Sequence, residues 1–264
     1  MSESRGETVR EFRGEAVGES RGDRPHTTVV LAMSADGKIA DRQRQAARFG
    51  SGIDRLYLEQ QIALADAVLL GAGTLRAYGT SLGVTDPTLL AQRQNRGQPP
   101  QPIQILCSRS GRLDPHWRFF QQGFPRWLLT SQDPLGQWWN PAVSQVFDQV
   151  LIGQNLPPER EKDGSDLHWQ PIGKRLIQQG IRSLVVLGGG TLVASLLHQQ
   201  AIDELHLTLC PLLLGGDTAP TPVGGRGWLE TAAISLELLQ AETIGNEVFL
   251  RYKVLAPEPA ARTL

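Results

Sequence analysis

Short apolar runs of strand length recur along the chain and alternate with segments of helical periodicity. Near-continuous apolar runs of this kind are typical of strands that are buried on both faces of a parallel sheet. We expect strands at residues 27–33, 67–70, 102–107, 127–130, 147–152, 184–187 and 202–210. Apolar positions spaced by three and four residues predict helices at 52–65, at 172–179 and from Thr191 onwards, with a further helical turn through Tyr78.

The end of the chain breaks this alternation. Residues 234–242 and 247–255 flank Gly245 and Asn246, and this pattern favours an antiparallel hairpin. We therefore predict one α/β domain over residues 26–256. It has a mixed, mostly parallel central sheet, helices on both faces and an antiparallel C-terminal hairpin.

Other segments carry no such periodicity. Residues 1–25 alternate charged residues with Gly and Ser, so we expect a disordered tail, and residues 257–264 are expected to be frayed. The polar, proline-containing stretch 80–101 is predicted to be a long loop, and 154–166 a polar break. Ile39 and Ala40 are candidates for a short strand.

Two segments repeat one another and are the first candidates for a binding site. LLGAGTL at 69–75 and VLGGGTL at 186–192 each join an apolar strand to a helix through a glycine-rich turn. Glycine lets a ligand approach the backbone, and the free N–H groups of a first helical turn attract anions. Two such turns on adjacent strands could hold both phosphates of a dinucleotide. The alternative is a pair of tight strand-to-helix connections that bind nothing.

A third strand runs into hydroxyl and guanidinium side chains. Ser108, Arg109, Ser110 and Arg112 follow directly after residues 102–107. Such groups past the carboxyl end of a strand suit a phosphate monoester. A solvated basic loop is the alternative reading of the same residues.

Composition excludes several classes of protein. The 264-residue chain has a net charge of -1, so no global field recruits nucleic acid or an anionic membrane. Cys107 and Cys210 lie in apolar runs without metal-ligand spacing, which favours small buried residues over a disulfide or a zinc site. No apolar run approaches the roughly 20 residues that span a bilayer, and no signal-peptide pattern is present. A cytoplasmic setting fits best.

The motifs of covalent, metal-dependent and P-loop catalysis are absent. There is no GxSxG elbow, no HExxH and no glycine turn followed by Lys-Ser or Lys-Thr, and the match to the dinucleotide fingerprint GxGxxG is partial. Few side chains are suited to acid–base or covalent work. That composition suits hydride transfer, in which a cofactor carries the chemistry and the protein orients it.

Four segments in this order resemble a known family. They are AMSADGKIA at 32–40, DAVLLGAGTL at 66–75, VVLGGGTLVASLL at 185–197 and DELHLTLCPLLLGG at 203–216. The set resembles the C-terminal pyrimidine reductase domain of the RibD-type riboflavin biosynthesis enzymes, over about residues 27–255. The resemblance implies a dihydrofolate-reductase-like fold. It also implies NADPH-dependent reduction of the ribosylamino group of a phosphorylated aminouracil, 5-amino-6-(5-phosphoribosylamino)uracil, to a ribitylamino group.

The resemblance also implies roles for individual residues. Ala32 and Ile39 would border the nicotinamide, and Ser108 with Arg109 would meet the adenosine 2′-phosphate, which favours NADPH over NADH. The two glycine turns would hold the rest of the cofactor, through Gly71, Gly73 and Thr74 in the first and Gly188, Gly189, Gly190, Thr191 and Leu192 in the second.

The substrate half departs from the family's pattern. Leu187 stands where an acidic residue usually precedes the glycine run, and Ile62 stands where an Arg is usual. An ADDP element is replaced by residues 77–80, and a basic residue of the first strand is replaced near Val29. The remaining candidates for substrate contact, besides Leu187 itself, are Asp36, Lys38, Ser51, Arg55 and Arg76. Each also has a purely structural interpretation as a turn residue, a helix cap or a solvated charge.

Three hypotheses follow from these residues. The first is the pyrimidine reductase of riboflavin biosynthesis. The second is a reductase of the same fold with another heterocyclic or carbonyl substrate, and the third is a catalytically idle nucleotide-binding protein. We also expect a homodimer, because the closing strands and residues 203–210 carry more apolar surface than one sheet face needs.

Overall fold

The computed structural model describes residues 22–109, 111, 113–131, 145–154, 156 and 167–256. The C-terminal tail, nearly all of the expected N-terminal tail, most of the polar break at 154–166, and Ser110 and Arg112 lie outside these residues.

In the described part of the chain, one mixed sheet of nine strands runs through the molecule in the order β5-β4-β3-β2-β6-β1-β7-β9-β8. All pairs from β5 to β7 are parallel, whereas β9 pairs antiparallel with β7 and with β8. The strands are β1 (His26–Ser34), β2 (Ala67–Gly71), β3 (Ile103–Cys107), β4 (Arg126–Thr130), β5 (Gln149–Ile152), β6 (Ser183–Val186), β7 (Glu204–Cys210), β8 (Leu236–Ile244) and β9 (Glu247–Val254). The predicted mostly parallel sheet with an antiparallel C-terminal hairpin is confirmed.

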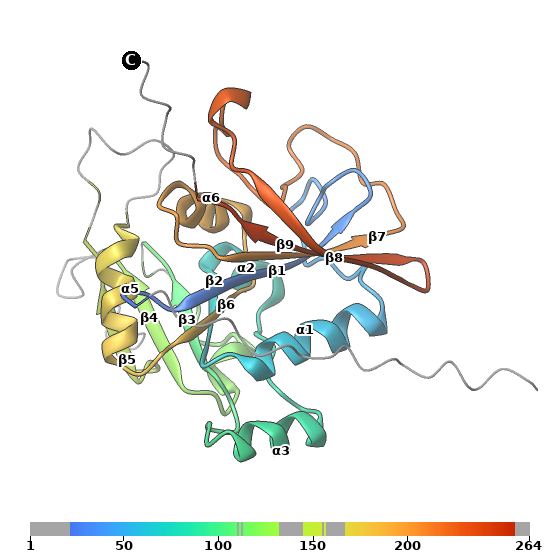
Figure 1. Cartoon of the computed structure of the whole chain (residues 1–264). Coiled ribbons are helices and arrows are strands. Elements are labelled where there is room, and N and C mark those ends of the chain that lie inside the picture. Colours follow the sequence, from blue (N-terminus) through green and yellow to red (C-terminus); the bar gives the residue numbers. More distant parts are fainter. Residues whose placement is uncertain are drawn as a thin grey trace, which may run out of the picture.

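Alternation along the strands assigns their side chains to two faces, because successive residues of a strand point in opposite directions. Val29 and Leu31 of β1 pack with α5 and α6, whereas Val30 packs with α1 on the other face. Helices therefore cover both faces, as predicted (Figure 1). The helices are α1 (Gly52–Leu64), α2 (Ala72–Tyr78), α3 (Pro87–Asn95), α5 (Trp169–Gln178) and α6 (Gly190–His198), with short 3-10 helices η1 (Arg118–Gln121) and η3 (Glu230–Ala232).

Two predictions of local structure were wrong. The expected loop at 80–101 contains helix α3, which begins at Pro87 after the side chain of Asp86 has capped its first N–H groups. Asp followed by Pro is a helix-start signal that the polar composition obscured. The expected strand at Ile39–Ala40 is a bend instead, because the Ile39 N–H donates to the Pro220 carbonyl rather than to a sheet partner.

Helix α3 also carries an arginine that is completely buried. The Arg93 guanidinium donates to the carbonyls of Ala63, Ala65 and Pro99 at 2.7–2.9 Å. Burial lowers the pKa of Arg93 to about 10. Because the last carbonyls of a helix have no partners within it and carry partial negative charge, Arg93 completes the C-terminal end of α1. Helices α1 and α3 are thereby joined on the same face of the sheet.

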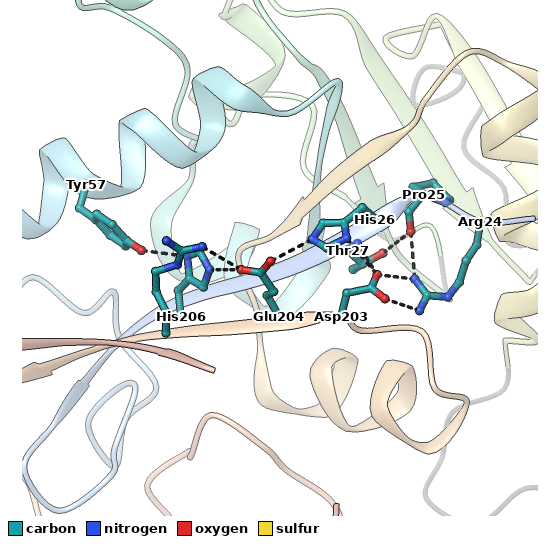
Figure 2. Close-up of polar contacts among 9 residues, drawn as sticks. Arg24, Pro25, His26, Thr27, Tyr57, Asp203, Glu204 and His206 are labelled. Carbon is teal, nitrogen blue, oxygen red and sulfur yellow. Dashed lines mark hydrogen bonds and ion pairs between the residues drawn. The ribbon is translucent and has the colours of Figure 1, made fainter. Parts of the chain in front are cut away.

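The start of β1 is held by an ion pair with the start of β7. Arg24 donates to both carboxylate oxygens of Asp203, at 2.6 and 2.8 Å, and the Thr27 N–H donates to the same group at 2.9 Å (Figure 2). Burial raises the pKa of Asp203, but these donors outweigh it and the pKa is lowered. Arg24 belongs to the segment that was expected to be disordered, and this contact ties it to the sheet.

Next to this pair, Glu204 is the centre of a buried polar network. Its carboxylate lies 2.9 Å from Nε2 of His206, 3.4 Å from Nε2 of His26 and 3.4 Å from Nη2 of Arg251. The Tyr57 hydroxyl lies 2.9 Å from Nδ1 of His206, so the network reaches from α1 across β7 (Figure 2). Hydrogen bonds from the two histidines hold the pKa of Glu204 well below its ordinary value, whereas burial lowers the pKa of His206.

We expect Glu204→Gln to lower the free energy of unfolding at pH 7 by about 2 kcal/mol, because it leaves the partly buried Arg251 without its anion and weakens the acceptor of His206. The folded pKa of Glu204 lies below the unfolded value near 4.5, so its contribution is present above that pH and is lost as pH falls below it. The difference between the variant and the wild type should therefore shrink below about pH 4.5 in urea unfolding curves.

Glu237→Gln is the matched control, because Glu237 forms a surface pair with Lys253 in which both side chains are half exposed. Such pairs contribute little, so its effect should stay below about 0.5 kcal/mol. Equal losses in the two variants would contradict a special role for the Glu204 network.

Candidate active site

The two glycine turns lie side by side at the carboxyl ends of neighbouring strands. Strands β2 and β6 pair in parallel, and the pairing continues past their ends, where the Gly71 N–H donates to the Gly188 carbonyl at 2.9 Å. The Leu187 N–H likewise donates to the Leu69 carbonyl at 2.9 Å. The repeated motifs of the sequence are therefore direct neighbours, and their helices α2 and α6 begin at the same edge of the sheet.

These two helices begin without the caps that the other α-helices of the described chain possess. The side chains of Ser51 and Asp86 cap α1 and α3, and the Gln199 side chain accepts the first N–H of α5. The N-cap residues of α2 and α6 are Gly71 and Gly189, which have no side chain to accept a hydrogen bond. The first N–H groups of both helices are thus available to an external acceptor, at the end of the helix that favours an anion.

Four glycines of the two turns fall into two groups, according to whether the fold would accept a larger residue. Gly188 has a φ of +93°, and a Cβ on Gly190 would lie 2.3 Å from the Thr221 carbonyl oxygen, so the fold itself excludes larger residues there. A Cβ on Gly189 would make only an ordinary contact, 3.6 Å from Oγ1 of Thr74, and one on Gly73 would meet nothing within 4 Å. Gly73 and Gly189 therefore leave space that the protein does not fill.

A buried hydroxyl without a partner lies one strand further along the same edge. Cys107 pairs with Gly71, so Ser108 follows β3 beside the first glycine turn. Its side chain is 2% exposed, and within the described chain its Oγ has no hydrogen-bond partner. A buried polar atom is normally bonded, so this hydroxyl is suited to an acceptor or donor supplied by a ligand. Arg109 is exposed beside it, and its carbonyl accepts a hydrogen bond from Thr130 at 3.4 Å.

The turn after β1 is built around Asp36. Its carboxylate accepts hydrogen bonds from the Ser34 hydroxyl and from the N–H groups of Leu214 and Gly215. The Ser34 hydroxyl is the first cause that lowers the pKa of Asp36 to about 2. Asp36 therefore fastens the β1 turn to the segment after β7, and its charge is already engaged within the protein. Lys38 is half-buried in the same turn, and no described residue forms an ion pair with its side chain.

The other predicted substrate residues have structural contacts or lie exposed on helices α1 and α2. Ser51 caps α1 and also donates its N–H and hydroxyl to Glu247, so its polar atoms are occupied. Arg55 and Arg76 are exposed on α1 and α2. Leu187 is half-buried and packs between two apolar clusters that contain Tyr57 and Ile62 of α1. Leu187, at the position where the family usually carries an acidic residue, is therefore part of an apolar cluster.

A half-buried carboxyl that the sequence did not single out belongs to Asp54. Asp54 lies in the first turn of α1, and the Thr208 side chain of β7 lowers the pKa of its carboxyl. Thr208 lies opposite Ala32, the residue expected to border the nicotinamide. Burial, and after it the nearby charge of Glu247, raise the pKa of Asp54 against the effect of Thr208. Asp54 was not singled out because α1 also carries Arg55 and Glu59, so another acidic residue does not stand out in its sequence.

The structural role of the long segment between β7 and β8 was also not predicted, because its glycines and prolines form no periodic pattern. It reaches the Ile39 N–H through the Pro220 carbonyl and the Gly190 carbonyl through the Gly224 N–H. The Trp228 ring lies against the His198 ring at the end of α6, with 4.2 Å between centroids. This segment thus links the β1 turn to the second glycine turn.

Comparison with known proteins places the chain in a family. The profile of the RibD C-terminal domain matches residues 25–250. The chain belongs to the RibD C-terminal domain family. It is 29% identical to 2,5-diamino-6-ribosylamino-4(3H)-pyrimidinone 5′-phosphate reductase of Archaeoglobus fulgidus, over 80% of this chain and 91% of that protein. It is 26% identical to the riboflavin biosynthesis protein RibD of Actinobacillus pleuropneumoniae, over 89% of this chain but only 58% of that protein.

A solved structure supports the fold. A pyrimidine reductase-like protein of Corynebacterium diphtheriae superposes with a TM-score of 0.73 at 21% identity, covering 89% of this chain and 94% of that one. This likeness confirms the expected fold class of the chain, a mixed and mostly parallel sheet with an antiparallel C-terminal hairpin. In the described part of the chain, no group of three or more His, Cys, Asp or Glu side chains could hold a metal ion. No helix there has the length and apolar character needed to cross a membrane.

We expect Gly73→Ala to weaken NADPH binding about tenfold, because its methyl group would occupy the space left beside the uncapped start of α2. Alanine favours a helix over glycine by roughly 0.5–1 kcal/mol, so the melting temperature should stay level or rise. The dissociation constant can be measured by titration of NADPH fluorescence.

Gly123→Ala is the matched control, because a Cβ there also meets nothing within 4 Å but lies before β4, at the opposite edge of the sheet. Its NADPH affinity should equal that of the wild type. Unchanged affinity in Gly73→Ala as well would remove the first turn from the cofactor site.

Proposed function

We propose that the protein is an NADPH-dependent reductase that converts the ribosylamino group of a phosphorylated aminopyrimidine to a ribitylamino group. The observation that carries this proposal is the pairing of two uncapped helix starts at one edge of the sheet. The names of the relatives, a ribosylaminopyrimidinone phosphate reductase and RibD, support the same reaction. The expected ring is that of 5-amino-6-(5-phosphoribosylamino)uracil, whereas the archaeal relative is named for a 2,5-diamino ring.

The cofactor's phosphates fit the edge formed by the glycine turns. The N–H groups of Gly190 and Thr191 at the start of α6 would hold the diphosphate, with Gly189 and Leu192 beside it. From the first turn, Gly71, Gly73 and Thr74 would complete this contact. The unpartnered Ser108 hydroxyl, with Arg109, would meet the 2′-phosphate, which is the reason to prefer NADPH over NADH.

The nicotinamide would lie against the end of β1, between Ala32 and Ile39. Strand β1 runs past the last residue of β6, since their register ends at Val29 and Val186 whereas β1 continues to Ser34. Ile39 is held in place by the Pro220 carbonyl, so the segment between β7 and β8 would orient this side of the site. When bound, NADPH supplies a hydride.

The reaction consumes one NADPH and one proton. Opening of the ribose ring gives a C=N bond at C1′; hydride addition at C1′ and protonation of the nitrogen then give the ribitylamine. The protein itself would hold the pyrimidine ring and C1′ beside Ala32. Apolar residues such as Leu187 would keep water out of the site.

The proposal is tested by the oxidation of NADPH in the presence of each of the two pyrimidine substrates, followed at 340 nm. We expect substrate-dependent oxidation with a kcat/KM for NADPH at least tenfold above that for NADH, because one charge-assisted phosphate contact distinguishes the cofactors. Complementation of a reductase-deficient riboflavin auxotroph provides the test in cells.

The apolar packing of Leu187 favours one alternative, a reductase of the same fold with a different heterocyclic substrate. NADPH binding without oxidation of either pyrimidine substrate, and without complementation, would reject the proposed function in favour of that alternative or of an idle nucleotide-binding protein.

We further propose a homodimer that forms through β8. This strand lies at the edge of the sheet, and its Leu236, Leu238 and Leu239 are 41%, 55% and 45% exposed. An edge strand offers unpaired backbone groups to a second chain, and exposed leucines add apolar area to that contact.

We expect the wild type to sediment as a dimer at micromolar concentration and Leu238→Lys to sediment as a monomer, because the strand's contact face would then carry a charge. Leu213→Lys is the control, since Leu213 is 76% exposed on the segment after β7 and is not part of β8. A monomeric wild type would contradict the dimer, and a dimeric Leu238→Lys would contradict the β8 contact.

A further inference from the structure

The segment that follows β7, residues 212–224, is fastened along one side to the β1 turn. We call it the connecting segment. The Ala35 N–H donates to the Leu212 carbonyl at 2.9 Å. The Ile39 N–H donates to the Pro220 carbonyl, also at 2.9 Å. Two backbone hydrogen bonds therefore hold the connecting segment against the turn beside which the nicotinamide is proposed to lie.

Asp36 adds a third bond between the β1 turn and the connecting segment. Its carboxylate accepts the N–H groups of Leu214 and Gly215 at 3.1 and 2.6 Å, and it also accepts the Ser34 hydroxyl at 2.6 Å. Hydrogen bonds to a carboxylate are stronger than those between neutral groups. Because Asp36 is exposed, its removal would release the segment without leaving a cavity in the core.

The other end of the connecting segment lies against the start of α6. The Gly224 N–H donates to the Gly190 carbonyl at 3.0 Å. A Cβ on Gly190 would lie 2.3 Å from the Thr221 carbonyl oxygen, so the two backbones are in direct contact. The Thr221 hydroxyl donates to the Val223 carbonyl at 2.7 Å, and Val223 packs against the apolar cluster that contains Leu192. This end of the segment is thus braced against α6.

Gly224 is a residue at which space, and not the backbone angle, excludes a side chain. Its φ lies outside the left-handed region. A Cβ there would lie 3.2 Å from the backbone nitrogen of Thr191 and 3.2 Å from the carbonyl carbon of Gly190, closer than an ordinary van der Waals contact. The Thr191 N–H is one of the groups proposed to hold the diphosphate. A side chain at position 224 would therefore crowd that N–H or push the connecting segment away from it.

Little slack separates the two ends. Pro220, bonded to the β1 turn, is four positions from Gly224, bonded to the glycine turn, and even a fully extended chain of that length spans only about 14 Å. A displacement of the segment at one end is therefore passed to the other.

We propose that Asp36 and Gly224 are positioning residues, which hold the connecting segment between the two ends of the bound cofactor so that the β1 turn and the diphosphate site are set together. The inference rests on the proposed function, because it assumes a cofactor at these two places. It gives Asp36 a role other than the substrate contact expected from the sequence. Without the Asp36 bonds the segment must be ordered when the cofactor binds, and that ordering lowers affinity.

The test uses 2′-phospho-ADP-ribose, a part of NADPH that has the diphosphate and the 2′-phosphate but no nicotinamide. Its dissociation constant is measured by calorimetry. Asp36→Ala should weaken its binding about fivefold although Asp36 lies at the nicotinamide end, because the segment is then ordered only on binding. Gly224→Ala should weaken its binding about tenfold, because the new methyl group displaces the segment beside Thr191.

The double variant distinguishes a shared segment from two independent effects. Independent losses multiply, which here would give about fiftyfold. Both substitutions release the same segment, so we expect the double variant to lose about tenfold, no more than Gly224→Ala alone.

Asp148→Ala is the matched control for Asp36→Ala. Asp148 is also an exposed carboxylate that accepts a backbone N–H from another segment, that of Arg126 at 2.6 Å, but it lies at the amino ends of β4 and β5. Gly123→Ala is the control for the glycine substitution. Both controls should bind the fragment as the wild type does.

A conservative variant protects the test against loss of the fold. Asp36→Asn keeps one carbonyl acceptor, so its affinity for the fragment should lie between those of the wild type and Asp36→Ala. Melting temperatures show which variants remain folded at the temperature of the titration.

The outcomes that overturn the inference leave the proposed function in place. Unchanged affinity for the fragment in Asp36→Ala and Asp36→Asn, with only NADPH binding weakened, would show that Asp36 acts at the nicotinamide alone. Losses that multiply in the double variant would show that the two residues act independently. A wild type that binds neither NADPH nor the fragment would instead reject the proposed function, and the inference with it.

Discussion

The parallel pairing of β2 with β6 is the contact on which the site depends. Residues 67–71 and 183–186 are more than a hundred positions apart in the sequence, yet their pairing continues into the hydrogen bond from Gly71 to Gly188. That bond sets two glycine turns beside one another and starts α2 and α6 at one edge. Because parallel strands end at the same edge, the turns, Ser108 and the end of β1 share it too.

The polar groups at the two edges of the sheet differ in whether they have partners within the protein. At the amino-terminal edge, charged groups are satisfied by one another: Arg24 binds Asp203, and Glu204 is surrounded by His26, His206 and Arg251. At the carboxyl-terminal edge, polar groups are left without partners in the described chain, in the uncapped helix starts and the Ser108 hydroxyl. A fold stabilised at one edge can keep unsatisfied groups at the other, where a ligand supplies the missing partners.

Much of this arrangement could be predicted from local patterns. Strands buried on both faces form continuous apolar runs, and the two glycine turns have nearly the same sequence. The sheet and the candidate cofactor residues could therefore be predicted from the sequence. The capping role of Ser51 was predicted as well. Helix α3 was missed because its apolar positions are few and it is held by Arg93, a buried cation that no periodicity reveals. Asp36 was expected to face the substrate, but its carboxylate holds the segment after β7.

The sequence by itself determined the class of fold, the family and the two turns, because hydrophobic alternation and glycine are local signals that each segment carries alone. Only the tertiary structure decided which groups are satisfied. Glu204 is surrounded by His26 of β1, His206 of β7 and Arg251 of β9, whereas the Ser108 hydroxyl that follows β3 has no partner within the described chain. The difference arises from strand register and helix placement, and these exist only once distant segments have packed together.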